Sequence, residues 1–227
     1  MKIIEKALKD GRNTLSEHES KQLLAAYDIP VTREILVENR KDLANAVNEI
    51  GFPLVMKGSS SSITHKTEKG LIRVDIRDEK EAGTTFEEIM AKMGGEGEGV
   101  LVQELVKGQR ELVVGLTRDP QFGPCVMFGL GGIFTEILKD ISFRVAPLER
   151  KDALDMMQEI KGHKILEAVR GMEPADLDTL AQILMNVGRI GLENDAIKEI
   201  DINPLILSGA RPVAVDALVV LEKGKSA

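Results

Sequence analysis

The chain has 227 residues, of which 43% are apolar and 30% charged, and its formal net charge is −7. This composition is typical of a globular protein with one large domain or two smaller lobes, and the acidic balance excludes a general nucleic-acid binder. No apolar stretch approaches the ~20 residues of a transmembrane helix, so we expect no membrane partner. The single cysteine, Cys125, excludes an internal disulfide, and acidic Glu5 lies too early for a secretory signal. A cytoplasmic location is therefore expected.

The first part of the chain alternates between helix and strand patterns. Ser16-Glu17-His18-Glu19 is a capping-box pattern, which predicts a helix that stops before Pro30. Strands are predicted at 35–37, 53–57 and 71–76, and helices at 41–50 and 79–93. The polar segment 58–69 is rich in Ser and Thr and is predicted to be a mobile loop.

Glycine alternates with acidic residues over 94–99, which predicts a boundary between two lobes. We expect a lead-in segment and the start of the first helix over 1–20, a smaller lobe over 21–98 and a larger lobe over 99–227. In the larger lobe, strands are predicted at 100–106, 111–117, 124–128, 133–138 and 141–146, then helices at 151–160 and 174–192. Short turns between the strands favour antiparallel sheets. The predicted fold class is α+β, with helices on one side of each sheet.

The end of the chain predicts a hairpin with oxygen ligands on one face. Glu199, Asp201 and Asn203 alternate with isoleucine, so their side chains share one face of a strand. If Gly209-Ala210 is a two-residue turn, Asn203 lies opposite Asp216, with Cβ atoms ~5 Å apart. Such oxygen donors suit Mg2+, which usually accompanies phosphates. The alternative is an ordinary polar strand face wetted by solvent.

Other positions have a chemical and a structural interpretation. Lys57 ends an apolar strand and could reach a phosphate, and the glycines at 129–132 could bring backbone N–H groups close to phosphate oxygens. The backbone of 103–106 could offer a donor and an acceptor to a planar base. Glu111 and Arg144 lie on strands that could face the same cleft. The structural alternatives are a surface lysine, a tight turn and solvated strand charges.

Several other chemistries are excluded or lack support. The sequence holds no histidine pair at metal spacing, so a zinc site is not expected, and it holds no Walker-type phosphate loop. Cys125 has no histidine nearby in the sequence and is interpreted as a small strand residue. His65 lies in the polar loop, where a lone histidine is usually inert.

Taken together, these motifs carry a family resemblance. From about Ser16 to Leu221, the chain resembles the β (ATP-grasp) subunit of ADP-forming acetyl-CoA synthetases, within the NDP-forming acyl-CoA synthetases. The segment 164–169 departs from the family, which tends to carry a glycine before the Arg-Gly pair. The resemblance rests on these segments in order: 53–57, 65–66, 102–104, 110–115, 119–120, 122–124, 128–132, 144–148, 170–171 and 199–205.

The resemblance implies an ATP-grasp fold, in which two lobes clamp ATP between them. It also implies these roles: Lys57 contacts the phosphates, Gln103, Glu104, Leu105 and Val106 hold the adenine, Glu111 helps to hold the nucleotide, Gly131 and Gly132 line the phosphates, and Arg144 faces the nucleotide. Asn203 and Asp216, with Asp201 as a third contributor, are implied to bind Mg2+. His65 matches a histidine implicated as a phosphoryl relay in some members, so His65 and Lys57 are the implied catalytic residues.

The implied reaction is the reversible conversion of acyl-CoA, ADP and phosphate into acid, CoA and ATP. The implied cofactors are ATP or ADP and Mg2+. The implied partner is an α subunit that carries CoA-binding and phosphohistidine domains, in an α2β2 hetero-oligomer. Two alternatives remain open from the sequence: a succinyl-CoA synthetase-type subunit, and a non-catalytic ATP-binding or assembly module.

Overall fold

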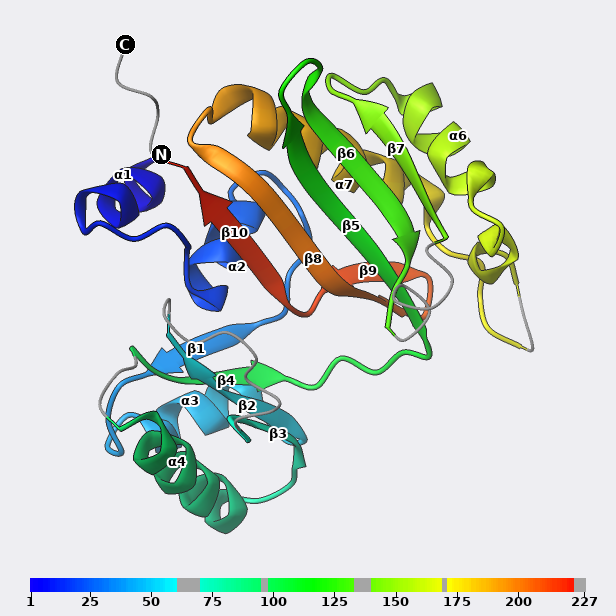
Figure 1. Ribbon diagram of the computed structural model, residues 1–227. Helices are drawn as coiled ribbons and strands as arrows, with labels where there is room; N and C mark the ends of the chain where they lie inside the picture. Colours follow the sequence, from blue (N-terminus) through cyan, green and yellow to red (C-terminus); the bar gives the residue numbers. More distant parts are fainter. Residues whose placement is uncertain (61–69, 95–97, 133–139, 169–170, 223–227) are drawn as a thin grey trace. The chain divides into compact units, whose positions relative to one another are not determined.

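The structure is a computed structural model that describes residues 1–60, 70–94, 98–132, 140–168 and 171–222 (Figure 1). The chain divides into two compact units. The smaller unit consists of Ser16–His18 and Thr32–Leu105. The larger unit consists of Met1–Leu15, Glu19–Val31 and Val106–Ala227. Each unit is an antiparallel sheet with helices packed on it, as the α+β prediction requires.

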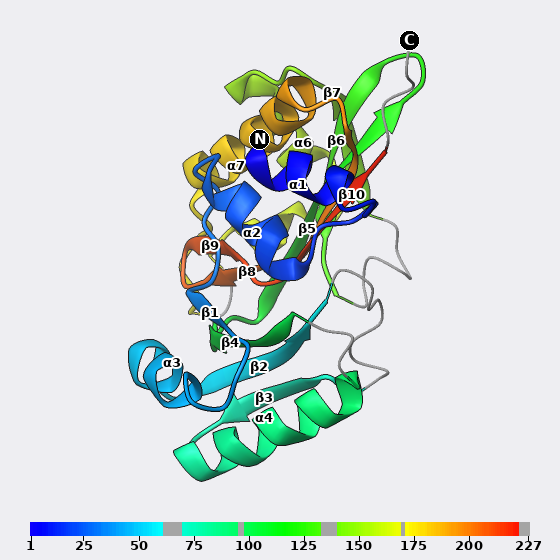
Figure 2. The ribbon, with the colours of Figure 1, turned by 90° about the vertical axis from the view of Figure 1, so that its left-hand side faces the viewer.

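The smaller unit has a four-stranded sheet in the order β1-β4-β2-β3. Figure 2 shows α4 along one face of β2 and β3. Alternate strand residues, such as Met56 and Val102, pack with Val47 and Phe86 of the helices in one apolar core. Asp78 caps α4 by accepting a hydrogen bond from the Glu81 backbone N–H at 2.8 Å. The elements are β1 (Glu34–Val37), α3 (Leu43–Ile50), β2 (Leu54–Ser59), β3 (Ile72–Ile76), α4 (Glu79–Met93) and β4 (Gly99–Glu104).

The boundary between the units differs from the expected one. β4 pairs with β1 on one side and with β2 on the other, so it is an inner strand of the smaller sheet. The smaller unit therefore ends at Leu105 instead of within 94–99. The N-terminal residues also differ from the expected lead-in, because most of the first 31 residues belong to the larger unit. These assignments depend on pairing between distant segments, which local composition does not report.

The larger unit has a six-stranded sheet in the order β10-β8-β5-β6-β7, with β9 paired to β8. All of its strand pairs are antiparallel, as the short predicted turns require. The strand expected at 133–138 lies outside the described residues. The strands are β5 (Arg110–Asp119), β6 (Gly123–Leu130), β7 (Ile141–Val145), β8 (Ile197–Ser208), β9 (Arg211–Ala214) and β10 (Ala217–Leu221).

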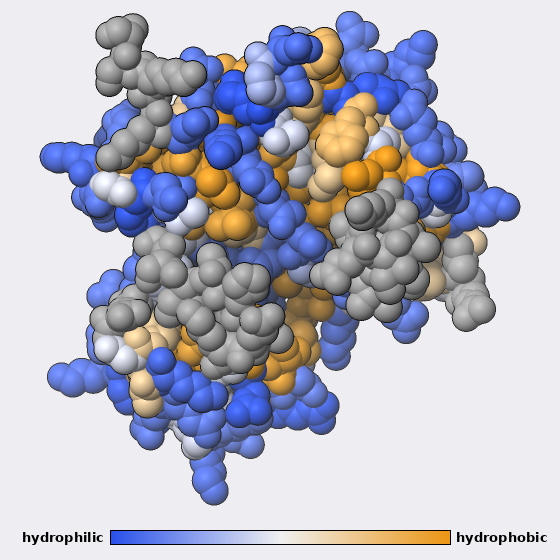
Figure 3. Space-filling view, in the orientation of Figure 1, coloured by the Kyte–Doolittle hydropathy of each residue, from blue (hydrophilic) through white to orange (hydrophobic). Residues whose placement is uncertain are grey.

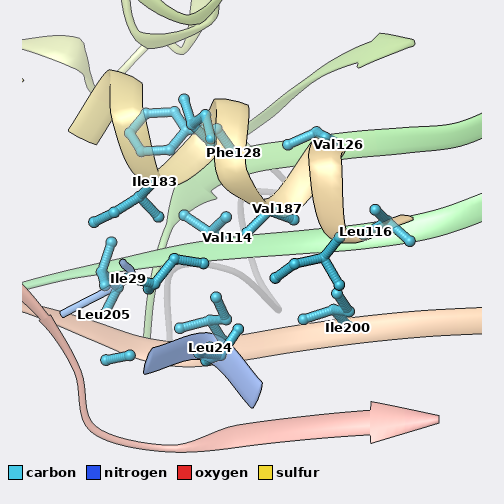
Figure 4. Close-up of a cluster of buried hydrophobic side chains, with 14 of the residues drawn as sticks. Leu24, Ile29, Val114, Leu116, Val126, Phe128, Ile183, Val187, Ile200 and Leu205 are labelled. Atoms are coloured by element: carbon cyan, nitrogen blue, oxygen red, sulfur yellow. The ribbon is translucent and has the colours of Figure 1, made fainter. Parts of the chain in front are cut away.

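The helices of the larger unit lie on one face of its sheet (Figure 2). Figure 4 shows the core between them, where Ile183 and Val187 of α7 meet Val114, Val126 and other strand residues. The helix α1 was not predicted. In the described part of the chain, no helix is long and apolar enough to cross a membrane. The helical elements are α1 (Lys2–Lys9), α2 (Glu17–Ala25), α6 (Arg150–Glu159), the 3-10 helix η1 (His163–Leu166) and α7 (Leu177–Glu193).

Candidate nucleotide and metal site

The terminal hairpin has a register that sets Asn203 across from Asp216. On one side of this pair, Leu205 is the partner of Ala214, and on the other side, Ile202 is the partner of Ala217. Both pairs follow the register that a two-residue turn at 209–210 imposes, because Ser208 pairs with Arg211. The predicted register is therefore confirmed. It was predictable because the turn and the alternating isoleucines are both local signals.

A β-bulge lies at the same position on the other side of β8. Leu112 of β5 pairs with Leu205, whereas Val114 pairs with Ile202. Two residues of β8, Asn203 and Pro204, therefore face one residue of β5. Bulges re-aim side chains and are common beside functional sites. Here the bulge keeps Ile202 and Leu205 in the core while Asn203 is exposed on the opposite face.

Asp201 has an unusual electrostatic environment. Burial, and to a lesser extent the nearby carboxylates of Glu199 and Asp216, together raise its pKa to about 6. Both effects disfavour the ionised form of Asp201. The electrostatic coupling also shows that Asp201 and Asp216 are neighbours on this face, as the sequence predicts.

These residues suit a hard cation in their donor chemistry. Asp201 and Asp216 supply carboxylate oxygens and Asn203 supplies an amide oxygen, the ligand types that Mg2+ prefers. Burial is the largest cause of the raised pKa of Asp201, and a bound cation would offset both the burial and the repulsion from Glu199 and Asp216. Within the described residues, no cluster of three or more His, Cys, Asp or Glu side chains has metal-site geometry. A site here therefore depends on the Asn203 amide as well as on carboxylates.

Glu111 and the glycine turn after β6 lie together in the larger unit. The Gly131 backbone N–H donates to the Glu111 carbonyl oxygen at 2.8 Å. Gly132 has a φ of +62°, and a Cβ atom there would lie 2.6 Å from Glu111 Oε2. Glycine is thus favoured at 132 by its backbone conformation, and a side chain there would also displace the flexible Glu111 carboxylate. The Gly131 N–H already donates to a carbonyl oxygen of the protein, so it would not donate to a phosphate. Gly131 would instead leave room for the phosphate beside the backbone.

The helix-free face of the larger sheet has two parts. One part carries the polar residues of β8 and the exposed Glu111. The other part lies at β7, where Phe143 and Val145 are each 47% exposed. Figure 3 shows apolar side chains at the surface in this region of the larger unit.

In the smaller unit, Lys57 and Gln103 lie on the sheet face away from α3 and α4. Their neighbours Met56 and Val102 point into the helix-covered core, so Lys57 and Gln103 point to the other side. Lys57 is buried, and its Nζ donates to Glu17 Oε1 at 2.7 Å. Lys57 is therefore a buried partner of a carboxylate and does not match the surface-lysine alternative.

The segment expected to hold adenine follows directly from β4. Gln103 is fully buried, whereas Glu104, Leu105 and Val106 are half-buried. The Glu104 N–H donates to the Arg33 carbonyl oxygen, and the Glu104 carboxylate accepts from Arg33 Nε at 3.0 Å. The N–H and the carboxylate of Glu104 thus have partners within the smaller unit. The carbonyl group of Glu104 and the backbone of the residues that follow would therefore be the groups that bind adenine.

Arg144 does not lie where it was expected. It is the strand partner of Val126, a residue of the helix-covered core, so its side chain points toward the helices. Its guanidinium group forms a bidentate ion pair with Glu159 of α6, which raises the pKa of Arg144 and lowers that of Glu159. Arg144 is thus a structural cation beneath the sheet. His65 lies outside the described residues.

Some buried charged residues were missed, among them Glu17 and Lys21 of α2 and Arg110 at the start of β5. Periodicity could have predicted their burial. Glu17 and Lys21 lie on the same helix face as buried Leu24, and Arg110 lies on the same strand face as Leu112. Arg110 donates to the carbonyl oxygens of residues 165, 167, 173 and 209. It therefore ties the segment after η1 to the β8–β9 turn.

The chain matches the model of the ATP-grasp domain over residues 6–221. It is 45% identical, over 96% of both chains, to the β subunit of acetate–CoA ligase (ADP-forming) I from Pyrococcus furiosus. It is 38% identical to the acetate–CoA ligase (ADP-forming) I of Archaeoglobus fulgidus, of which the match covers 32%.

A solved structure is also similar. It is the dinucleotide-forming acetyl-coenzyme A synthetase 1 of Candidatus Korarchaeum cryptofilum in complex with coenzyme A and Mg-AMPPCP, with its phosphohistidine segment pointing towards the nucleotide-binding site. The TM-score is 0.87 at 43% identity, over 97% of this chain and 99% of that chain. The chain therefore belongs to the ATP-grasp family, in the group that contains the β subunits of ADP-forming acetate–CoA ligases.

Proposed function

We propose that this chain is the nucleotide-binding subunit of an ADP-forming acyl-CoA synthetase. In the proposed reaction, the N–P bond of a phosphohistidine on a partner subunit breaks as a β-phosphate oxygen of ADP bonds to the phosphorus. The products are ATP and free histidine. The reverse reaction phosphorylates the histidine from ATP.

The observation that carries this proposal is the hairpin register, in which the pairs Leu205–Ala214 and Ile202–Ala217 flank Asn203 and Asp216. The side chains of Asn203, Asp216 and Asp201 would hold Mg2+, which neutralises phosphate charge when bound. Phosphoryl transfer needs positioned donors and charge neutralisation more than covalent work by the protein. Lys57 would contribute a fixed ammonium group, and the Gly131–Gly132 turn would let phosphate oxygens approach the backbone.

The partner is proposed from the relatives. The relative from Pyrococcus furiosus is named a β subunit, and the single-chain relative from Archaeoglobus fulgidus, of which the match covers 32%, holds further parts beside the matched region. We propose an α subunit with CoA-binding and phosphohistidine domains, in an α2β2 assembly. His65 remains a proposed phosphoryl relay within this scheme.

The test is to purify the tagged chain with its partner from the native host and to supply acetyl-CoA, other acyl-CoA thioesters, phosphate and ADP. The proposal predicts ATP formation that depends on both phosphate and an acyl-CoA. A complex that binds ADP but forms no ATP from any acyl-CoA would favour the non-catalytic nucleotide-binding module instead.

A further inference from the structure

Glu17 lies at the start of α2, in a segment whose sequence suggested only a helix cap. Its side chain is 1% exposed and that of Lys57 is 6% exposed, and Glu17 Oε1 accepts from Lys57 Nζ at 2.7 Å. Both residues belong to the smaller unit, 40 positions apart in the sequence. This distance and burial describe a charge-assisted hydrogen bond removed from solvent.

The neighbouring residues of the segment have different partners. The Arg12 guanidinium group donates to both Glu19 carboxylate oxygens, at 2.6 and 2.8 Å. His18 Nδ1 lies 2.9 Å from Glu34 Oε1. Each charged group at 17–19 therefore has its own partner, and Glu17 is the one directed to the residue expected to contact phosphate.

The surroundings of Lys57 explain why a carboxylate is needed there. Its strand neighbours across the sheet are Ile72 of β3 and Leu101 of β4, which offer no charge. Glu98, whose carboxylate lies 3.3 Å from Ser59 Oγ, is a further acidic group beside the same end of β2. A buried ammonium group without a counter-ion loses its proton easily, because burial disfavours the charged form.

We propose that Glu17 is a positioning residue that keeps the Lys57 ammonium group charged and oriented for the phosphates of the nucleotide. The inference rests on the proposed function, since it assigns Lys57 to phosphate binding. Glu17 touches no reacting atom in this account and acts only through Lys57.

The test measures the dissociation constant of MgADP for the whole chain by calorimetry, between about pH 7.5 and pH 9, where ADP is fully ionised. Wild type and Glu17→Asp keep a counter-ion, so their affinity stays flat over this range. Glu17→Gln removes the counter-ion, so its affinity falls by about tenfold for each pH unit as Lys57 deprotonates. Lys57→Met binds weakly at every pH, and the double variant Glu17→Gln/Lys57→Met behaves like Lys57→Met.

Glu34→Gln is the matched control. It also neutralises a carboxylate of the smaller unit that is largely removed from solvent, with 7% of its side chain exposed, but Glu34 bonds to His18 and Thr32. It should keep the flat wild-type profile, and circular dichroism verifies that every variant is folded. If the affinity of Glu17→Gln for MgADP varies with pH as that of wild type does, while Lys57→Met binds weakly, the inference is wrong but the proposed function stands. Failure of wild type to bind MgADP overturns the proposed function, and unchanged binding by Lys57→Met overturns the role of Lys57 and the inference with it.

Discussion

At the scale of single residues, the functional argument depends on charges held in unfavourable surroundings. Asp201 lies between two other carboxylates, and its pKa is raised to about 6 by burial, Glu199 and Asp216. Such an arrangement destabilises the ligand-free fold when all three groups are ionised. Functional sites often store this kind of electrostatic strain, and a bound cation relieves it.

The raised pKa of Asp201 predicts a pH dependence with a defined sign. The folded state binds the Asp201 proton more tightly than the unfolded state does, because the folded pKa of about 6 exceeds the ordinary value of 3.8. The stabilisation is therefore present below the unfolded pKa and is lost as the pH rises through about 6. Urea unfolding without divalent ions should show that the stability of Asp201→Asn relative to wild type increases between about pH 4 and pH 6 and is constant above about pH 7.

Asp178→Asn is the control, since this exposed carboxylate pairs with Arg150 far from the hairpin in sequence. It should not gain stability over the same range. Parallel curves for wild type and Asp201→Asn would contradict the account of Asp201.

At the scale of elements, two glycine turns shape the site in different ways. Gly132 follows β6 and Gly209 joins β8 to β9, and each has a φ of +62°. A Cβ atom at 132 would lie 2.6 Å from Glu111 Oε2, whereas at 209 its nearest neighbour would be Glu173 Oε2 at 3.7 Å. A side chain therefore has the same backbone cost at both positions. Only at position 132 would its Cβ atom also lie within 3 Å of Glu111.

We predict that Gly132→Ala and Gly209→Ala each destabilise the fold by about 1–2 kcal/mol, the cost of the left-handed conformation. Gly132→Ala should also weaken MgADP binding, because the new methyl group displaces the Glu111 carboxylate. Thermal unfolding and calorimetry separate the two effects. Equal ADP affinities in the two variants would show that the Gly132–Glu111 contact has no role in nucleotide binding.

Arg110 gives a further prediction at this scale. It is 3% exposed and donates to four backbone carbonyl oxygens, which belong to η1, the segment after η1 and the β8–β9 turn. Arg110→Met leaves these oxygens without their charged donor, so it should lower the free energy of unfolding by about 3 kcal/mol or more. Urea denaturation measures this loss, and a change below about 1 kcal/mol would contradict it. Arg33→Met is the control, since Arg33 is an exposed cation of the smaller unit.

At the scale of the whole molecule, local patterns predicted the elements better than their assembly. The antiparallel pairing and the register that sets Asn203 opposite Asp216 followed from turn residues and alternation. The assignment of β4 to the smaller sheet did not follow from local patterns, because its partner residues in β1 and β2 lie 40 or more residues earlier. The Glu17–Lys57 pair and the orientation of Arg144 also depend on contacts between distant segments.

The central claim is that Asp216, Asn203 and Asp201 bind a divalent ion together with a nucleotide, and MgADP titration of the whole chain tests it most directly. The account predicts that Asp216→Ala and Asn203→Ala remain folded, bind MgADP at least about tenfold more weakly than wild type, and lose the dependence of ADP affinity on Mg2+. Wild-type affinity for MgADP in both variants, with an unchanged dependence on Mg2+, would contradict it.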